Sequence, residues 1–292
     1  MPENLLILGG AGFLGSHLVS EFAGKYHVYV LEKQDCHLSR IENYLENIEL
    51  HYAEKTVIHQ FLSQNPMDFI INCSVSYGLS ESLEDLEENN VTMPLNWIES
   101  CGNRTKAFIN TDTFFNKPEN HSYSYLGGYI QTKKQLEEKL KYGKKGLKII
   151  NLKLEHLYGP GDSKSKFIPS MISRLLANEK EIKMTPGNQV RDFIYVKDVA
   201  KAYSVILENI DEIKDGFTGI SAGTGKGTSI RELSRHMKEL IKSSSDIQFG
   251  ALPYRDHEIM HSSGDPAFLT ALGWKIKYDL SEGLRETIHS IS

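Results

Sequence analysis

A glycine-rich stretch near the amino terminus constrains the fold of this chain more than any other feature. Gly9, Gly12 and Gly15 follow the apolar run Leu5–Leu8 and open an amphipathic segment, Phe13–Phe22. The order of strand, glycine turn and helix is typical of a dinucleotide-binding βα unit. Gly9 permits a tight turn, Gly12 lets a pyrophosphate approach the backbone, and Gly15 allows close packing of helix on strand. The helix N-terminus then offers free N–H groups to the phosphates. A plain strand-to-helix turn is the alternative interpretation.

Short apolar runs alternate with amphipathic stretches through the first half of the chain. This pattern predicts buried parallel strands joined by right-handed crossovers, and therefore a Rossmann-type doubly wound parallel sheet of the α/β class. The predicted strands are Leu5–Leu8, His27–Leu31, Ile48–Tyr52, Phe69–Cys73, Ala107–Asn110 and Lys148–Leu152. The predicted helices are Phe13–Phe22, Val57–Gln64, Ser82–Cys101 and Tyr129–Tyr142. Pro94 interrupts the third helix, so we expect a kink or a new start there.

The rhythm changes after about residue 157, where strands become sparse and loops are richer in Gly and Pro. Helices are predicted at Ile168–Leu176, Val199–Leu207, Ser229–Lys242, Pro266–Leu272 and Ser281–Ile291. We expect residues 1–157, with about 191–215, to form a dinucleotide-binding domain. Residues 158–190 and 216–292 are expected to form a smaller α/β lobe that binds substrate, with the active site in the cleft between the lobes.

A carboxylate ends the second predicted strand, where folds of this kind bind the adenosine ribose. Glu32 at this position favours NAD(H) and repels the 2′-phosphate of NADP(H). Lys33 and Arg40 lie close by and could hold that phosphate, so either cofactor fits the pattern. A solvated surface acid is the alternative interpretation of Glu32. The predicted cofactor-binding residues are Gly9, Gly12, Phe13, Leu14, Gly15, Glu32, Lys33, Cys73, Tyr129 and Lys133.

Tyr129 and Lys133 stand four residues apart and share one face of a predicted helix. A nearby ammonium stabilises phenolate and is expected to lower the pKa of the tyrosine. A tyrosine with a pKa near neutrality can exchange a proton with a substrate hydroxyl or carbonyl. Such a spacing alone is often a surface pair, but its place after the fifth strand favours catalysis. Thr111, at the end of that strand, could bond the same oxygen; otherwise Thr111 and Asp112 cap a turn.

The composition excludes several other classes of protein. The net charge is −5, without long runs of one sign, so we expect neither nucleic acid nor a membrane surface as partner. The apolar stretches are shorter than the roughly 20 residues of a membrane span. The three cysteines are an odd number without close pairing, which is typical of reduced thiols in a cytoplasmic protein. The Cys and His spacing predicts no metal site.

The glycine turn, together with Thr111, Tyr129 and Lys133, resembles the pattern of the extended short-chain dehydrogenases/reductases. This family is the group of nucleotide-sugar epimerases, dehydratases and reductases, and the resemblance covers nearly the full chain. Further matches to that family are Asn90-Val91, the Tyr-Gly-Pro-Gly loop at 158–161, the segment Arg191–Val199 and Leu272-Gly273-Trp274. Finer motifs resemble the CDP-abequose synthase group, whose enzymes reduce the C4 ketone of a nucleotide-linked 4-keto-deoxysugar. These motifs are residues 110–115, 154–162, 166–169 and 255–260.

The resemblance implies an NAD(P)H-dependent 4-ketoreductase of deoxysugar biosynthesis, as for lipopolysaccharide. The implied catalytic residues are Thr111, Tyr129 and Lys133, and the implied substrate-binding residues are Asp112, His156, Arg191 and Arg255. The two arginines suit the diphosphate of a CDP-, dTDP- or GDP-linked sugar, unless they pair with Asp192 and Asp256. His156 stands where most relatives have Asn, and it contacts the sugar or is a structural loop histidine. A homodimer is usual in the family.

Two alternative functions use the same residues. The first is an NAD-dependent C4 epimerase of nucleotide sugars, which would keep its cofactor through a cycle. The second, more remote, is a non-catalytic dinucleotide sensor, which is expected to lack the tyrosine or the lysine that this chain retains. A 4,6-dehydratase is disfavoured, because Asp112 is followed by Thr113 in place of the glutamate of its acid–base pair.

Overall fold

A computed structural model describes residues 2–52, 58–78, 82–117 and 126–292 of the chain. The chain divides into two compact units. Unit 1 combines Met1–Pro118, Tyr125–Lys153 and Ala200–Ile220. Unit 2 contains Leu154–Val199 and Ser221–Ser292.

Seven strands of the described residues form the central sheet of unit 1, in the order β10-β6-β5-β4-β1-β2-β3. The pairs β1–β2, β2–β3, β1–β4 and β4–β5 are parallel. The strand order reverses between β1 and β4, which confirms the predicted doubly wound sheet and brings the carboxyl ends of these strands to its switch point. The strands are β1 (Asn4–Leu8), β2 (His27–Glu32), β3 (Ile48–Tyr52), β4 (Phe69–Asn72), β5 (Ala107–Thr113), β6 (Lys148–Leu154) and β10 (Gly216–Ala222).

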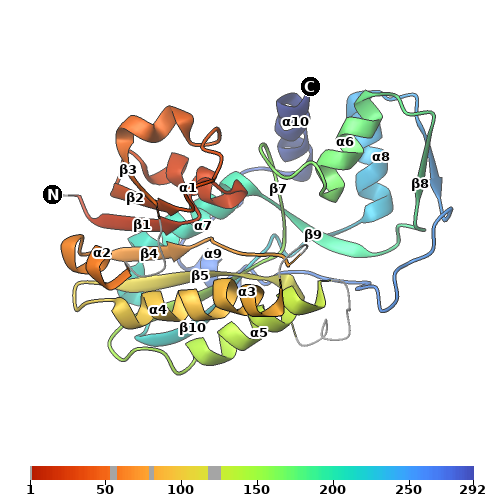
Figure 1. Cartoon of the computed structure of the whole chain (residues 1–292). Coiled ribbons are helices and arrows are strands. Elements are labelled where there is room, and N and C mark those ends of the chain that lie inside the picture. Colours follow the sequence, from red (N-terminus) through yellow and green to blue (C-terminus); the bar gives the residue numbers. More distant parts are fainter. Residues whose placement is uncertain (1, 53–57, 79–81, 118–125) are drawn as a thin grey trace. The chain divides into compact units, whose positions relative to one another are not determined.

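Helices cover both faces of this sheet, with α1 and α7 on one face and α2, α4 and α5 on the other (Figure 1). The helices are α1 (Phe13–Phe22), α2 (Ile58–Gln64), α3 (Leu83–Glu87), α4 (Met93–Ser100), α5 (Gly127–Leu140) and α7 (Val196–Glu208). Short 3₁₀ turns lie at Glu42–Asn47, Phe114–Asn116 and Ile210–Glu212. On the first face, Glu21 of α1 accepts hydrogen bonds from Lys201 and Ser204 of α7 at 2.7 and 2.9 Å.

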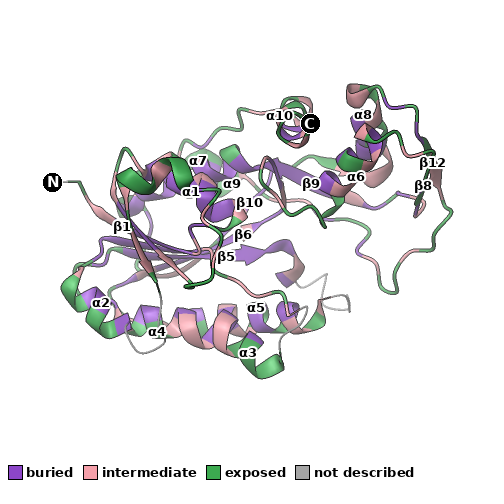
Figure 2. Ribbon diagram, turned by 45° about the horizontal axis from the view of Figure 1, so that its top comes forward, coloured by how far each residue is buried: buried purple, intermediate pink, exposed green. Residues whose placement is uncertain are grey.

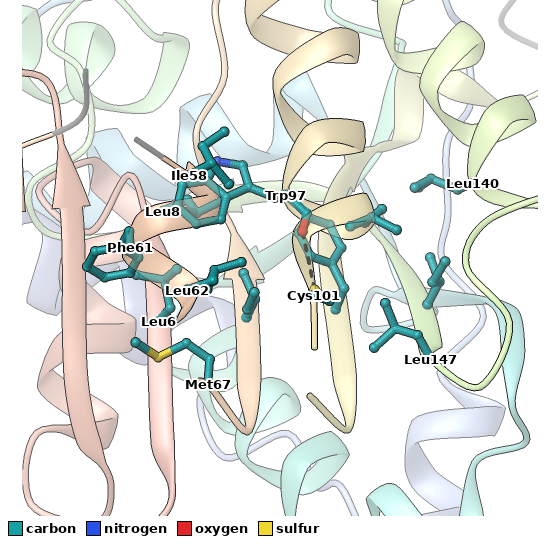
Figure 3. Packing of buried hydrophobic residues seen from close by; sticks show 14 of the residues in the cluster. Leu6, Leu8, Ile58, Phe61, Leu62, Met67, Trp97, Cys101, Leu140 and Leu147 are labelled. Atoms are coloured by element: carbon teal, nitrogen blue, oxygen red, sulfur yellow. Dashed lines mark hydrogen bonds between the residues drawn. The ribbon is translucent and has the colours of Figure 1, made fainter. Parts of the chain in front are cut away.

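The apolar core of unit 1 lies between the sheet and helices α2, α4 and α5 (Figure 3). Leu6 and Leu8 of β1 face Phe61 of α2, whose ring meets Trp97 of α4 edge-on at 6.2 Å. The Cys101 thiol donates to the Trp97 carbonyl at 3.3 Å. The strands β5 and β6 are largely buried (Figure 2), as expected for a sheet that is covered on both faces.

The predicted helix over Ser82–Cys101 is divided in the structure. Ser82 caps α3 by accepting a hydrogen bond from the Asp85 N–H group, a π-helical turn follows at Glu88–Thr92, and α4 begins at Met93. Pro94 therefore lies in the first turn of α4, where a backbone N–H group has no partner within the helix, so its absence costs no hydrogen bond. The predicted new start is confirmed. Val57, the first residue of the predicted second helix, lies outside the described residues.

One strand departs from the sequence prediction. Residues 216–292 were assigned to the substrate lobe, but β10 joins the edge of the central sheet beside β6. Its segment, Gly-Phe-Thr-Gly-Ile-Ser-Ala, has two glycines and little apolar character, so neither alternation nor a hydrophobic run marks it as a strand. Pairing with β6 decides its conformation instead.

Unit 2 holds two small sheets and a group of helices. Within its described part, β7, β9 and β11 form a three-stranded sheet, and β8 pairs with β12 in a two-stranded one. Helices α6, α8 and α10 pack on one another. The elements are β7 (His156–Tyr158), β8 (Glu181–Met184), β9 (Val190–Tyr195), β11 (Gly227–Ser229), β12 (Asp246–Phe249), α6 (Phe167–Leu176), α8 (Ile230–Ile241), α9 (Ala267–Ala271) and α10 (Leu280–Ile291).

Candidate active site

The glycine turn joins β1 to α1 at the switch point of the sheet. Gly9 has a φ of 78°, in the left-handed region, and its N–H group donates to the Leu31 carbonyl at 3.2 Å. A Cβ on Gly15 would lie 2.0 Å from the Gly9 carbonyl oxygen, so this close approach of helix and turn requires glycine. Phe13 and Leu14 begin α1, and Leu14 is buried against the unit.

The same turn fits the pyrophosphate of a dinucleotide. Gly12 is exposed and is the N-cap residue of α1, and it forms no side-chain cap, so N–H groups of the first helical turn are available to an anion. Within the described residues, a Cβ on Gly12 would meet the Gly9 carbonyl oxygen alone, at 3.2 Å. The space in front of Gly12 is therefore open toward a ligand, as the predicted cofactor-binding role requires.

The Glu32 carboxylate lies at this turn and not on the open surface. Its Oε1 atom accepts a hydrogen bond from the Ala11 N–H group at 2.5 Å. Burial raises the pKa of Glu32, while backbone hydrogen bonds from Ala11 and Lys33 and the charge of Lys33 act against the rise. Lys33 is exposed, and Arg40 donates to the Ala11 carbonyl at 3.4 Å. One acidic and two basic side chains thus surround the predicted ribose position.

Tyr129 lies in the first turns of α5, and its side chain is 6% exposed. Its hydroxyl is hydrogen bonded to the side chain of Thr113, and its ring lies 5.0 Å from that of Tyr77. Thr111 is predicted to bond the same substrate oxygen as Tyr129, whereas the Tyr129 hydroxyl itself contacts Thr113. Side chains alternate along a strand, so residues 111 and 113 face the same side of β5, and the residue nearer its end reaches Tyr129.

Thr111 contacts Tyr203, Cys73 and Lys133. Its hydroxyl bonds the Tyr203 hydroxyl of α7 at 2.7 Å and lies 3.4 Å from the Cys73 sulfur. Its carbonyl accepts a hydrogen bond from the Lys133 ammonium at 2.8 Å. The Lys133 nitrogen also lies 5.9 Å from the centre of the Tyr129 ring. Thr111, Tyr129 and Lys133 are thus brought together, with Thr111 bonded to Lys133 and not to Tyr129.

The expected lowering of the Tyr129 pKa is not found in the structure. Burial raises the pKa of Tyr129 well above its usual value, and Tyr77 and Asp112 act in the same direction. The hydrogen bond with Thr113 opposes the rise. Burial also lowers the pKa of Lys133, against the attraction of Asp112. Desolvation therefore outweighs the neighbouring ammonium, and Tyr129 keeps its proton at neutral pH.

Asp112, a predicted substrate-binding residue, is buried in the structure. Its side chain points to the opposite face of β5 from Thr111 and Thr113 and is 1% exposed. Its Oδ2 atom accepts hydrogen bonds from Asn151 at 2.8 Å and Asn116 at 3.0 Å. The carboxylate therefore belongs to the interior of unit 1.

The other predicted substrate residues lie in unit 2. Arg191 is buried, and its guanidinium donates to the Glu258 carboxylate at 2.8 Å and to the Val190 carbonyl. The alternative pairing with Asp192 is not observed, because Asp192 accepts hydrogen bonds from the N–H groups of Thr224, Gly225 and Gly264. The partner of Arg191 stands 67 residues away in sequence, which local reasoning could not supply.

Arg255 and His156 occupy different positions in the same unit. Arg255 is exposed, and its carbonyl accepts the N–H group of Glu258, the residue that also bonds Arg191. His156 opens β7, with its ring 5.6 Å from that of Phe193 and its Nδ1 atom 3.9 Å from Glu155. Glu258 thus contacts both predicted phosphate-binding arginines. It lies inside the motif at residues 255–260, but the sequence pattern does not show that it pairs with Arg191.

Within residues 2–52, 58–78, 82–117 and 126–292, His, Cys, Asp and Glu side chains form no cluster suited to a metal ion. No helix in that part of the chain combines the length and the apolar character needed to cross a membrane.

Comparison with known proteins assigns the chain to a family. Residues 5–218 match the model of the NAD dependent epimerase/dehydratase family. The chain is 33% identical to CDP-abequose synthase of Salmonella typhimurium over 99% of its own length and 98% of that protein. It is 27% identical to a putative UDP-glucose 4-epimerase of Methanocaldococcus jannaschii, over 98% and 97% of the two chains.

A solved structure shows the same fold. UDP-glucose 4-epimerase of Thermotoga maritima, determined with UDP-glucose, superposes with a TM-score of 0.83 at 24% identity and covers 98% of each chain. The match over more than half of the chain and the 33% identity over its full length establish the relationship. The chain therefore belongs to the NAD dependent epimerase/dehydratase family and is an NAD(P)-dependent oxidoreductase that modifies nucleotide sugars.

Proposed function

We propose that this chain uses NAD(P)H to reduce the C4 ketone of a nucleotide-linked 4-keto-deoxysugar, in deoxysugar biosynthesis for a surface polysaccharide. One observation carries the proposal: Tyr129 is buried, bonded to Thr113, and keeps its proton because burial raises its pKa. Reduction of a ketone consumes a proton at the carbonyl oxygen, so a phenol that stays protonated until charge develops suits this direction. The 33% identity to CDP-abequose synthase supports a CDP-linked substrate.

The side chains around Tyr129 account for the proton and the charge in this reaction. Bound NAD(P)H supplies the hydride that forms the new C–H bond at C4. Tyr129 gives its proton to the ketone oxygen, which forms the O–H bond and leaves a phenolate that solvent reprotonates. Thr113 offers a second hydrogen bond to that oxygen as negative charge grows. Lys133, anchored on the Thr111 carbonyl, stabilises the transient phenolate.

The binding roles follow the two units. We propose that unit 1 binds the dinucleotide through the glycine turn and Glu32, and that unit 2 binds the nucleotide sugar. Arg191 and Arg255 would hold its diphosphate, since guanidinium forks match phosphate oxygens. Arg191 then exchanges its bond with Glu258 for a phosphate oxygen. His156 would face the sugar.

We also propose a homodimer formed through α3, α4 and α5. Leu83 of α3 is 73% exposed and Tyr142, just beyond α5, is 90% exposed, so this side of unit 1 carries uncovered apolar surface. The free thiols of Cys36, Cys73 and Cys101 suit a reducing compartment such as the cytoplasm. Light scattering on the purified chain gives its molar mass and so distinguishes the proposed homodimer from a monomer.

The direct test is a set of CDP-, dTDP- and GDP-linked 4-keto-6-deoxyhexoses, each incubated with NADH or NADPH. We expect one of these sugars to be reduced with consumption of one reduced nicotinamide per ketone, followed by its absorbance. A C4 epimerase would interconvert the 4-hydroxy sugars with no net consumption. Binding of the dinucleotide without turnover of any sugar would identify a sensor and contradict the proposal.

A further inference from the structure

An exposed aromatic ring lies against the buried phenol of Tyr129. The ring centre of Tyr77 lies 5.0 Å from that of Tyr129, with an angle of 34° between the two planes. Tyr77 is 42% exposed, whereas Tyr129 is 6% exposed. One part of the Tyr77 ring therefore covers Tyr129, and the rest of that ring is accessible to a ligand.

The Tyr77 ring stands at the edge of the sheet where folds of this kind bind their ligands. The neighbouring parallel strands β4 and β5 end at Asn72 and Thr113, and Tyr77 follows shortly after β4. The Tyr129 hydroxyl is bonded to the Thr113 side chain. In doubly wound sheets, ligands bind beyond the carboxyl ends of the strands. The exposed part of the Tyr77 ring is therefore beside the position proposed for the C4 ketone.

A buried amide fixes the backbone next to Tyr77. Asn90 is 2% exposed and lies in the π-helical turn that precedes α4, and such turns are frequent at functional sites. Its side chain accepts the Ser76 N–H group and donates to the Ser76 carbonyl, both at 2.8 Å. It also donates at 3.1 Å to the Thr132 hydroxyl, which donates to the Tyr129 carbonyl at 2.9 Å. One amide thus connects the backbone beside Tyr77 to that of Tyr129, so the two rings are held together before a ligand binds.

The chemistry of an aromatic face determines which part of a sugar can lie on it. The ring offers apolar surface to C–H groups and no hydrogen bond to a hydroxyl. A hydroxyl placed against it would lose water without gaining a partner, which costs free energy. When the C4 oxygen is at the Tyr129 hydroxyl, C5 and the C6 group that it carries are among the sugar atoms nearest to the neighbouring ring. In a 6-deoxysugar this group is a methyl.

We propose that Tyr77 is a specificity-determining residue, whose exposed ring contacts the C6 methyl and so selects 6-deoxysugars over sugars with a C6 hydroxyl. This inference rests on the proposed function, because it needs the C4 oxygen at Tyr129. A protein pocket discriminates between groups that differ by one methylene or one hydroxyl by roughly 10- to 100-fold. Since Tyr77 offers a single open ring, its contribution is about 10-fold, at the lower end of this range.

The test uses two nucleotide sugars that differ only at C6. One is the 6-deoxy product of the reduction, and the other is the same compound with a C6 hydroxyl. Oxidation of their C4 hydroxyl groups by NAD(P)⁺ is the reverse of the proposed reaction, and the ratio of the two kcat/KM values gives the preference for the 6-deoxysugar. In Tyr77→Ala this preference should fall about 10-fold, mainly through KM. Tyr77→Phe keeps the ring and should keep the preference. The matched control is Tyr142→Ala, which removes a tyrosine that is 90% exposed beyond α5, and it should also keep the preference.

Two results would overturn the role of Tyr77. If Tyr77→Ala lowers kcat/KM equally for both sugars, the ring only covers Tyr129 and does not contact C6. If Tyr77→Phe loses the preference as far as Tyr77→Ala does, the hydroxyl and not the ring discriminates. Tyr77→Gln keeps the test decisive if Tyr77→Ala disturbs Tyr129, because it retains bulk over that ring but presents a polar surface. It should lose the preference as Tyr77→Ala does, and a Tyr77→Gln protein that keeps it would refute the contact.

A binding measurement separates this inference from the proposed function. Calorimetric titration of the same two sugars gives their affinities for the parent chain and for Tyr77→Ala without any turnover. The parent chain should bind the 6-deoxysugar more tightly, by about 10-fold, and Tyr77→Ala should bind both alike. Affinities that change equally for both sugars would contradict the role of Tyr77, whereas tight and selective binding without oxidation or reduction would contradict the proposed function alone.

Discussion

Replacing the glycines of the β1–α1 turn one at a time separates their structural role from their role toward the cofactor. In Gly15→Ala the new Cβ would lie 2.0 Å from the Gly9 carbonyl oxygen and 2.8 Å from the Gly10 Cα atom. Both are backbone atoms, so α1 must move by roughly 1 Å to restore contact distances. Overpacking of this kind costs about 1–3 kcal/mol, which corresponds to a Tm lower by about 2–5 °C for a chain of this size.

Two other glycines complete the series: Gly12→Ala is the control for stability, and Gly24→Ala is the control for both stability and NADH binding. Gly12→Ala meets only the Gly9 oxygen, at 3.2 Å, so its Tm should fall little while its methyl group occupies the phosphate position. The Cβ of Gly24→Ala would meet nothing within 4 Å among the described residues, so this variant should change neither the Tm nor the affinity for NADH. We expect Gly15→Ala and Gly12→Ala to weaken NADH binding by about 100-fold, or 2.7 kcal/mol. Calorimetric titration and thermal unfolding read the two quantities separately, and a Gly15→Ala protein equal to Gly24→Ala in both would refute the assignment of this turn.

Four further substitutions test other parts of the molecule. Thr113→Val should lower kcat/KM by about 10²-fold, the loss typical of one oxyanion donor, and Thr111→Val should cost less, because its hydroxyl bonds Tyr203; equal losses would contradict the placement. Glu32→Gln removes a charge beside the ribose and should raise affinity for NADPH relative to NADH, by calorimetry, whereas an unchanged ratio would leave Glu32 without that role. Asp192→Asn places an amide NH₂ group at the buried position 192 against the N–H groups of Gly225 and Gly264, and should cost about 3 kcal/mol in urea unfolding. A cost under about 1 kcal/mol would contradict the bonding described.

The sequence predicts best where local pattern and tertiary structure demand the same thing. The bounds of α1, Phe13–Phe22, were predicted to the residue, because a glycine turn begins this helix and apolar periodicity spans it. The central sheet followed from the alternation of strands and helices. By contrast, β10 was not predicted, because its two glycines give it no strand-like sequence pattern and its conformation depends on pairing with β6.

The site was predicted less completely than the fold. Tyr129 and Lys133 carry a recognisable spacing, and the structure brings them together. The contact of Thr113 with Tyr129 and the burial of Asp112 were not expected for one reason: β5 was predicted to end at Asn110, but it continues to Thr113. Within a strand, alternation sends 111 and 113 to one face and 112 to the other. Buried asparagines conceal this continuation, because only their mutual hydrogen bonds make polar residues acceptable in a core strand.

The most direct test of the proton-donor claim is hydride transfer by Tyr129→Phe under single-turnover conditions, with excess enzyme and bound reduced cofactor. The substitution removes the phenolic hydroxyl and keeps the buried ring, so cofactor binding by calorimetry should match that of the parent chain. We predict a rate lower by about 10²-fold or more, the contribution of a positioned general acid. A Tyr129→Phe protein that transfers hydride at the parent rate, with its cofactor bound normally, would contradict the account.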